Sequence, residues 1–129
     1  MSAINMERFD HYVVKILAKL YQEFPVDCVL EMSALAESPL EETVCWDTYR
    51  WLRDEGYIRQ FDAFLGGTAI VVLSYKGLEC LNAVPDSLQE DTSFGDQLVA
   101  AVNEGAYDAA CGLVPKILEF GFRLMTSGG

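Results

Sequence analysis

The sequence predicts a mainly helical α+β fold, and three observations point to it. Apolar residues recur at helical spacing over residues 6–24 and again beyond residue 94. Two runs rich in β-branched and aromatic residues, 57–61 and Thr68–Leu73, stand on either side of a Gly-Gly pair. The helical stretches end at proline or glycine, which cannot continue a helix at low cost. Together these patterns predict helices around one small hairpin.

Three helices are expected in the first half of the chain. Residues 6–24 place their apolar side chains on one helical face. Residues 27–37 are expected to form a shorter second helix. Ser38 is a candidate N-cap for a third helix over residues 39–55, and Gly56 is expected to end that helix in a left-handed conformation.

A two-stranded hairpin and a short helix follow. The glycines at 66 and 67 supply the turn between the two strands. Ser74 is expected to cap a short helix over Tyr75–Asn82. Residues 1–84 are therefore expected to form one domain.

The C-terminal third is expected to be a polar, acidic linker over residues 85–93 and an apolar helical segment over 94–126. Asp91, Thr92 or Ser93 can cap the first helix of that segment. Gly112 and Pro115 are expected to kink the second helical stretch. Its apolar face is wider than one small core covers, so a homodimer is expected. The dimer-interface candidates are Val114, Ile117, Leu118, Phe120, Phe122 and Leu124.

Two motifs carry a resemblance to a known superfamily. Residues 51–59, W-L-R-D-E-G-Y-I-R, resemble the end of a winged-helix recognition helix that runs into its wing. Residues 73–81, L-S-Y-K-G-L-E-C-L, resemble the exit from the second wing strand. Residues 6–84 thus resemble the winged helix-turn-helix superfamily, and the whole chain is similar to small uncharacterised bacterial winged-helix proteins. The resemblance implies a winged helix-turn-helix with a two-stranded wing, a fold best known for binding DNA.

The charge of the third helix argues against DNA as the ligand. The chain carries a formal net charge of -11, which repels a phosphate backbone. The acids of the third helix, Glu41, Glu42, Asp47, Asp54 and Glu55, outnumber its two bases, Arg50 and Arg53. These two arginines are expected to pair with Asp47 and Asp54. If DNA were bound, the residues expected to contact it would be Arg50, Arg53, Arg59 and Lys76.

The tip of the hairpin is aromatic and apolar, and it contains neither Lys nor Arg. Phe61, Phe64 and Leu65 resemble residues that contact another protein, although one or two of them folding back onto the core is an equal alternative. Of the two tryptophans, Trp46 is expected to be the exposed interface anchor and Trp51 the core residue.

No pattern in the sequence indicates catalysis, and the chain is not expected to be an enzyme. The sequence holds no nucleophile, phosphate-binding or zinc-protease motif, and no cofactor or metal is expected. His11 is expected to be solvated on the polar face of the first helix. The four cysteines are widely spaced and are expected to be reduced thiols in the cytoplasm.

Three hypotheses of function remain open. The first is a non-catalytic, dimeric winged-helix module that binds another protein through Trp46, Phe61, Phe64 and Leu65. The second is a DNA-binding transcriptional regulator, and the third is an acidic decoy that mimics DNA. No membrane span is expected, because the longest charge-free run is short and is broken by two glycines.

Overall fold

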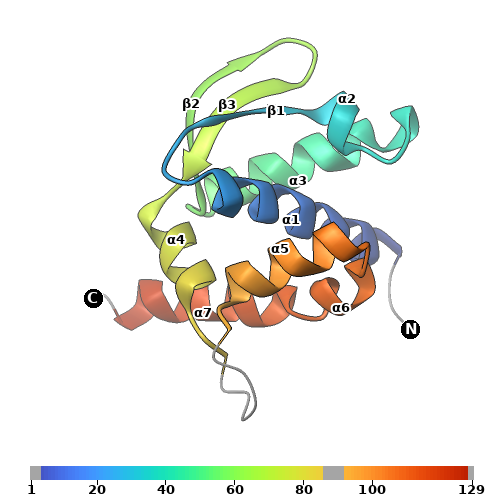
Figure 1. The fold of residues 1–129 in the computed structure, drawn as a ribbon. Coiled ribbons are helices and arrows are strands. Elements are labelled where there is room, and N and C mark those ends of the chain that lie inside the picture. Colours follow the sequence, from blue (N-terminus) through green and yellow to red (C-terminus); the bar gives the residue numbers. More distant parts are fainter. Residues whose placement is uncertain (1–3, 86–91, 128–129) are drawn as a thin grey trace.

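A computed structural model of the chain describes residues 4–85 and 92–127, which form a mainly helical α+β fold (Figure 1). A three-stranded antiparallel sheet of order β1-β3-β2 lies on one side of the fold, away from the C-terminal helices. The elements are α1 (Ile4–Glu23), β1 (Cys28–Glu31), α2 (Met32–Leu35), the 3-10 turn η1 (Pro39–Glu41), α3 (Glu42–Asp54), β2 (Ile58–Phe64), β3 (Thr68–Leu73), α4 (Tyr75–Asn82), α5 (Phe94–Glu104), α6 (Tyr107–Cys111) and α7 (Val114–Ser127).

Local signals placed several helix ends correctly. The Ser74 hydroxyl accepts a hydrogen bond from the Gly77 amide at the start of α4, and the Ser93 hydroxyl does the same for Asp96 in α5. Gly105 ends α5 at φ 74°, in the left-handed region that glycine tolerates. Asp91, the alternative cap of α5, lies outside the described residues.

The expected helix over residues 27–37 is wrong in its first part. Cys28–Glu31 is instead strand β1, which pairs with β3 and makes the expected two-stranded hairpin a three-stranded sheet. Leu30 faces the core opposite Ala69, and Val29 is exposed opposite Ile70. Pairing with a strand about forty residues further on outweighs local helix propensity here. Ser38 makes no side-chain cap, because η1 intervenes before α3 begins at Glu42.

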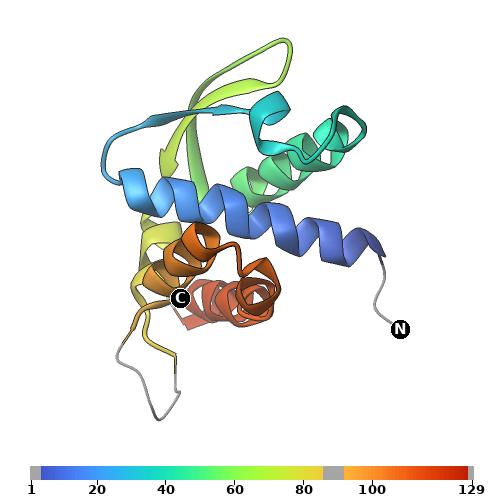
Figure 2. The ribbon, with the colours of Figure 1, turned by 45° about the vertical axis from the view of Figure 1, so that its right-hand side comes forward.

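Helix α1 is buried on more than the single face that its apolar spacing predicts. Ile16, Leu17 and Ala18 are all buried in succession, although neighbouring helix residues point about 100° apart. Figure 2 shows the reason: α1 runs between the sheet and α3 on one side and the C-terminal helices on the other. The two layers therefore share α1 as their common support.

The C-terminal helices belong to the same hydrophobic core as the rest of the chain. The expected kink is a break between α6 and α7, and Pro115 lies in the first turn of α7, where its missing N–H is tolerated. Helix α7 packs mainly against α4 and only slightly against α1. The residues that this segment adds to the core are Phe94, Leu98, Ala110, Val114 and Ile117.

A polar network fastens the loop before α3 to α1. Lys15 donates to Glu37 Oε2 at 2.5 Å and to the Leu35 carbonyl at 2.7 Å. His11 Nε2 lies 2.8 Å from the same Glu37 oxygen. The Tyr12 hydroxyl donates to Glu41 and accepts from the Glu37 amide. The loop is thus held at several points along about one turn of α1.

We expect a small, pH-dependent loss of stability on replacing Glu37 with glutamine. Hydrogen bonds from Lys15, and then from His11, hold the pKa of Glu37 below its usual value of 4.5. A lowered pKa stabilises the fold above the unfolded-state value, and this contribution is lost as the pH falls through the folded-state pKa. Because the carboxylate is half exposed, we expect about 0.5 kcal/mol near neutral pH.

Urea unfolding near neutral pH and in acid measures this effect. Glu31→Gln, at an exposed position on β1, is the matched control and should leave stability unchanged at both pH values. An E37Q deficit that persists undiminished at a pH well below 4.5 would show that the carboxylate charge is not the cause.

Candidate functional site

The three apolar side chains predicted at the hairpin tip all reach solvent. Phe61 is 56% exposed, Phe64 is 50% exposed and Leu65 is fully exposed. None of them folds back onto the core, which decides between the two alternatives left open by the sequence. Single exposed apolar residues are common on protein surfaces, but three within five positions of one hairpin form a patch.

The backbone around the tip holds these side chains outward. The register of β2 against β3 shifts between Gln60 and Asp62, so Phe61 sits in a β-bulge. Gly66 and Gly67 have φ of 95° and 87°, which only glycine adopts without strain. The carbonyl of Gly67 accepts a hydrogen bond of 2.9 Å from the Met32 amide, and this braces the turn against α2.

The patch continues across the outer face of the sheet. Asp62, Ile70 and Val29 lie opposite one another on β2, β3 and β1, and so do Phe64, Thr68 and Glu31. Paired residues share a face, and the intervening row of Ala63, Ala69 and Leu30 points to the core. We call Val29, Phe61, Phe64, Leu65 and Ile70 together the hairpin surface.

The charged residues beside the hairpin surface are mostly acidic. Glu31 and Asp62 stand on its face, while the Arg59 guanidinium lies over the Phe61 ring at 5.7 Å from its centroid. Two carboxylates and one guanidinium leave an excess of one negative charge. The surface thus joins exposed apolar area to a weakly acidic border.

The four bases considered for DNA contact all have partners within the chain. Arg50 pairs with Asp47 at 3.5 Å and Arg53 pairs with Asp54 at 2.9 Å, as expected. Arg53 also donates to the Gln60 side chain.

Lys76 and Arg59 are likewise engaged. Lys76 donates to the Glu55 carbonyl at 2.7 Å and lies 4.3 Å from the Tyr57 ring centroid. Arg59 contacts Phe61, as described above. All four cations therefore have contacts within the chain.

The tryptophans are placed the other way round from the prediction. Trp46 is half-buried and packs against Tyr49, whereas Trp51 is 40% exposed between Phe9 and Tyr57. Both flank the buried face of α3 at about 110° from its centre, so helical spacing alone does not separate them. The neighbouring elements decide their exposure, and Trp51 is the better candidate for a surface contact.

The dimer-interface candidates divide by burial. Val114 and Ile117 are buried within the core of a single chain, so neither is available to a second copy. Leu118, Phe120 and Leu124 are half-buried, and Phe122 is 64% exposed. A homodimer through α7 stays a prediction. Phe122 is the most exposed of the candidate residues and would be its main contact.

His11 is not the solvated side chain that the sequence predicts. It is half-buried beside Glu37, with its ring 4.8 Å from that of Tyr107 in α6. Glu37 is distant in sequence, so no local pattern could have revealed the pair.

Burial raises the pKa of the Cys45 and Cys80 thiols to about 11, which keeps them protonated and unreactive.

Within the described residues, no group of three or more His, Cys, Asp or Glu side chains is placed to hold a metal ion. No helix in that part of the chain is long and apolar enough to cross a membrane. Comparisons with family models, with curated proteins and with solved structures find no match for this chain. The function proposed below is therefore inferred from the hairpin surface.

Proposed function

We propose that this chain is a non-catalytic winged-helix module that binds another protein through its hairpin surface. The observation that carries the proposal is the joint exposure of Phe61, Phe64 and Leu65 on a braced hairpin. Burying apolar area of this kind is worth about 25 cal/mol per Å², and a rigid hairpin gives up little entropy when it docks.

The order of elements supports the winged-helix part of the proposal. Three helices are followed by the β2–β3 hairpin, and β1 joins that hairpin to make a three-stranded sheet. In this arrangement α3 takes the place of the recognition helix and the β2–β3 hairpin takes the place of the wing. The C-terminal helices then form a second layer on α1 and α4.

The partner we infer presents an apolar groove bordered by Lys or Arg. The groove would receive Phe64 and Leu65, and the basic border would face Asp62 and Glu31. The net charge of -11 would speed the approach of such a surface and slow that of an acidic one.

The pairing of the bases supports a protein partner over DNA. Phosphates that contact Arg50 or Arg53 would also lie near the paired carboxylates of Asp47 and Asp54. These carboxylates offset the two cations, so the favourable electrostatic contribution to DNA binding would be small.

Titration of a labelled DNA duplex at low salt tests this choice. We expect no saturable binding, and no difference between the wild type and the Arg50→Glu/Arg53→Glu variant. Tight binding that weakens steeply with salt and is lost in that variant would instead assign α3 to DNA, and the proposal would then be wrong.

A further inference from the structure

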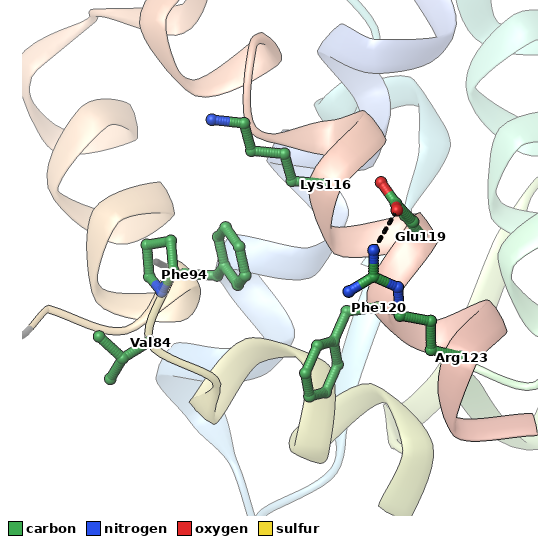
Figure 3. Close-up of a pocket in the computed structure, with 7 residues that line it drawn as sticks. Val84, Phe94, Lys116, Glu119, Phe120 and Arg123 are labelled. Carbon is green, nitrogen blue, oxygen red and sulfur yellow. Dashed lines mark hydrogen bonds and ion pairs between the residues drawn. The ribbon is translucent and has the colours of Figure 1, made fainter. Parts of the chain in front are cut away.

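A pocket of 340 Å³ lies between α7 and the two ends of the α4–α5 connection (Figure 3). Ligand pockets commonly measure about 300–1,000 Å³, so this one has room for a single small molecule. Its lining comes from the end of α4 onward, α5 and α7. Helices α5 and α7 lie on the opposite side of α1 from the β2–β3 hairpin (Figure 1). Its lining includes Val84, Phe94, Lys116, Glu119, Phe120 and Arg123.

The pocket is built by packing that fixes both of its walls. The Phe94 amide donates to the Ala83 carbonyl at 2.9 Å, which holds Val84 beside the start of α5. Phe94 itself is buried in the core, and Phe120 is half-buried on the facing side of α7. Figure 3 shows Val84 and Phe94 on one side of the hollow and the α7 side chains on the other. The hollow thus lies between α7 and the start of α5.

The lining joins an apolar floor to a cationic rim. The rings of Phe94 and Phe120 offer hydrocarbon contact, while Lys116 and Arg123 stand one above the other along α7. Glu119 accepts a hydrogen bond of 2.6 Å from Arg123 at the solvent-exposed edge of the pocket. Among the lining residues that the structure describes, two cations and one carboxylate leave an excess of one positive charge, in a chain whose net charge is -11.

We propose that this pocket binds a small amphiphilic monocarboxylate. The carboxylate accepts from Lys116, with Arg123 adding to the positive potential, and the hydrocarbon part packs on Phe94 and Phe120. A single negative charge matches the local excess of one positive charge. Glu119 and the net charge of the chain repel any anion, and they repel a dianion such as a phosphate monoester more strongly than a monocarboxylate. Both an alkyl and an aryl hydrocarbon can pack on the aromatic floor.

Calorimetric titration with sodium octanoate and with sodium 3-phenylpropionate tests the proposal, and it tells an alkyl body from an aryl one. We expect saturable binding of one molecule per chain for at least one of these acids. 1-Octylamine, which carries the opposite charge on the same alkyl body, should not bind. An absence of saturable binding for both acids, or equal binding of octylamine, would overturn the proposal.

Two charge reversals locate the site. Lys116→Glu should weaken carboxylate binding by about tenfold or more, because a charge-assisted hydrogen bond is replaced by repulsion. Lys19→Glu, an equal change of charge at an exposed position on α1 outside this pocket, should leave the affinity unchanged. Equal affinities for wild type and K116E, or equal weakening by the two variants, would show that the pocket is not the site. None of these outcomes depends on the hairpin surface.

Discussion

Replacing Ile117 with alanine should lower the free energy of unfolding of the whole chain by about 2–5 kcal/mol. Ile117 lies in α7 with none of its surface exposed, in the cluster that also contains the buried residues of α1 and α4. Removing its outer carbons takes apolar contacts from the core that α7 shares with α4 and α1, and leaves a cavity that close-packed neighbours fill only in part. The loss should therefore affect the sheet end of the fold as well as α7.

A second residue of α7 provides the matched control. Phe122 is 64% exposed, so Phe122→Ala should change stability by less than about 0.5 kcal/mol in the monomer. Urea unfolding followed by tryptophan fluorescence and by circular dichroism measures both variants, and the two probes should give one coincident transition. If I117A melted the C-terminal helices in a separate step and left the tryptophan signal unchanged, the shared core would be refuted.

Replacing Gly77 with alanine should destabilise the fold by about 1–3 kcal/mol, although alanine ordinarily favours a helix by about 1 kcal/mol over glycine. A Cβ at this position in α4 would lie 2.3 Å from the Tyr57 carbonyl oxygen. That oxygen also accepts a hydrogen bond from the Ser74 amide, so the backbone there cannot move aside freely. The clash therefore outweighs the gain in helix propensity.

Gly112→Ala is the control for this substitution. Its Cβ would meet nothing closer than 3.4 Å, and its φ is an ordinary helical value of -64°. Thermal melts of the two variants should show a lowered midpoint for G77A and little change for G112A. A G77A midpoint at or above that of the wild type would mean that α4 does not approach Tyr57 this closely.

Much of the fold was predictable because its signals are local. Ser74, Ser93 and Gly105 mark helix ends through bonds or dihedral angles that involve only the nearest residues. The two strands of the hairpin were likewise visible, because β-rich runs flank a Gly-Gly turn.

The errors arose where distant residues decide the structure. Strand β1 exists because Val29 and Leu30 pair with β3. No pattern within residues 27–37 indicates that this segment pairs with a distant strand. Trp46 and Trp51 flank the same helical face, so only Phe9 and Tyr57, brought close by the fold, distinguish them.

The candidate site shows the same division. The pairing of Arg50 and Arg53 with nearby acids follows from short sequence spacings, and the structure confirms it. The sequence left the exposure of the apolar tip open, and the structure shows that its side chains reach solvent. The pocket between Phe94 and Lys116 could not be predicted, because its walls come from separate segments that meet only through packing.

Photo-crosslinking from position 64 in living cells of the source organism tests the central claim most directly. p-Benzoylphenylalanine in place of Phe64 keeps an aromatic ring in the middle of the hairpin surface. The same probe at Tyr75, which is 76% exposed on α4, serves as the control for exposure alone. We expect a discrete protein adduct from position 64 that is resistant to nuclease and absent from position 75. A nuclease-sensitive adduct, or no adduct from position 64, would contradict the assignment of the hairpin surface to a protein partner.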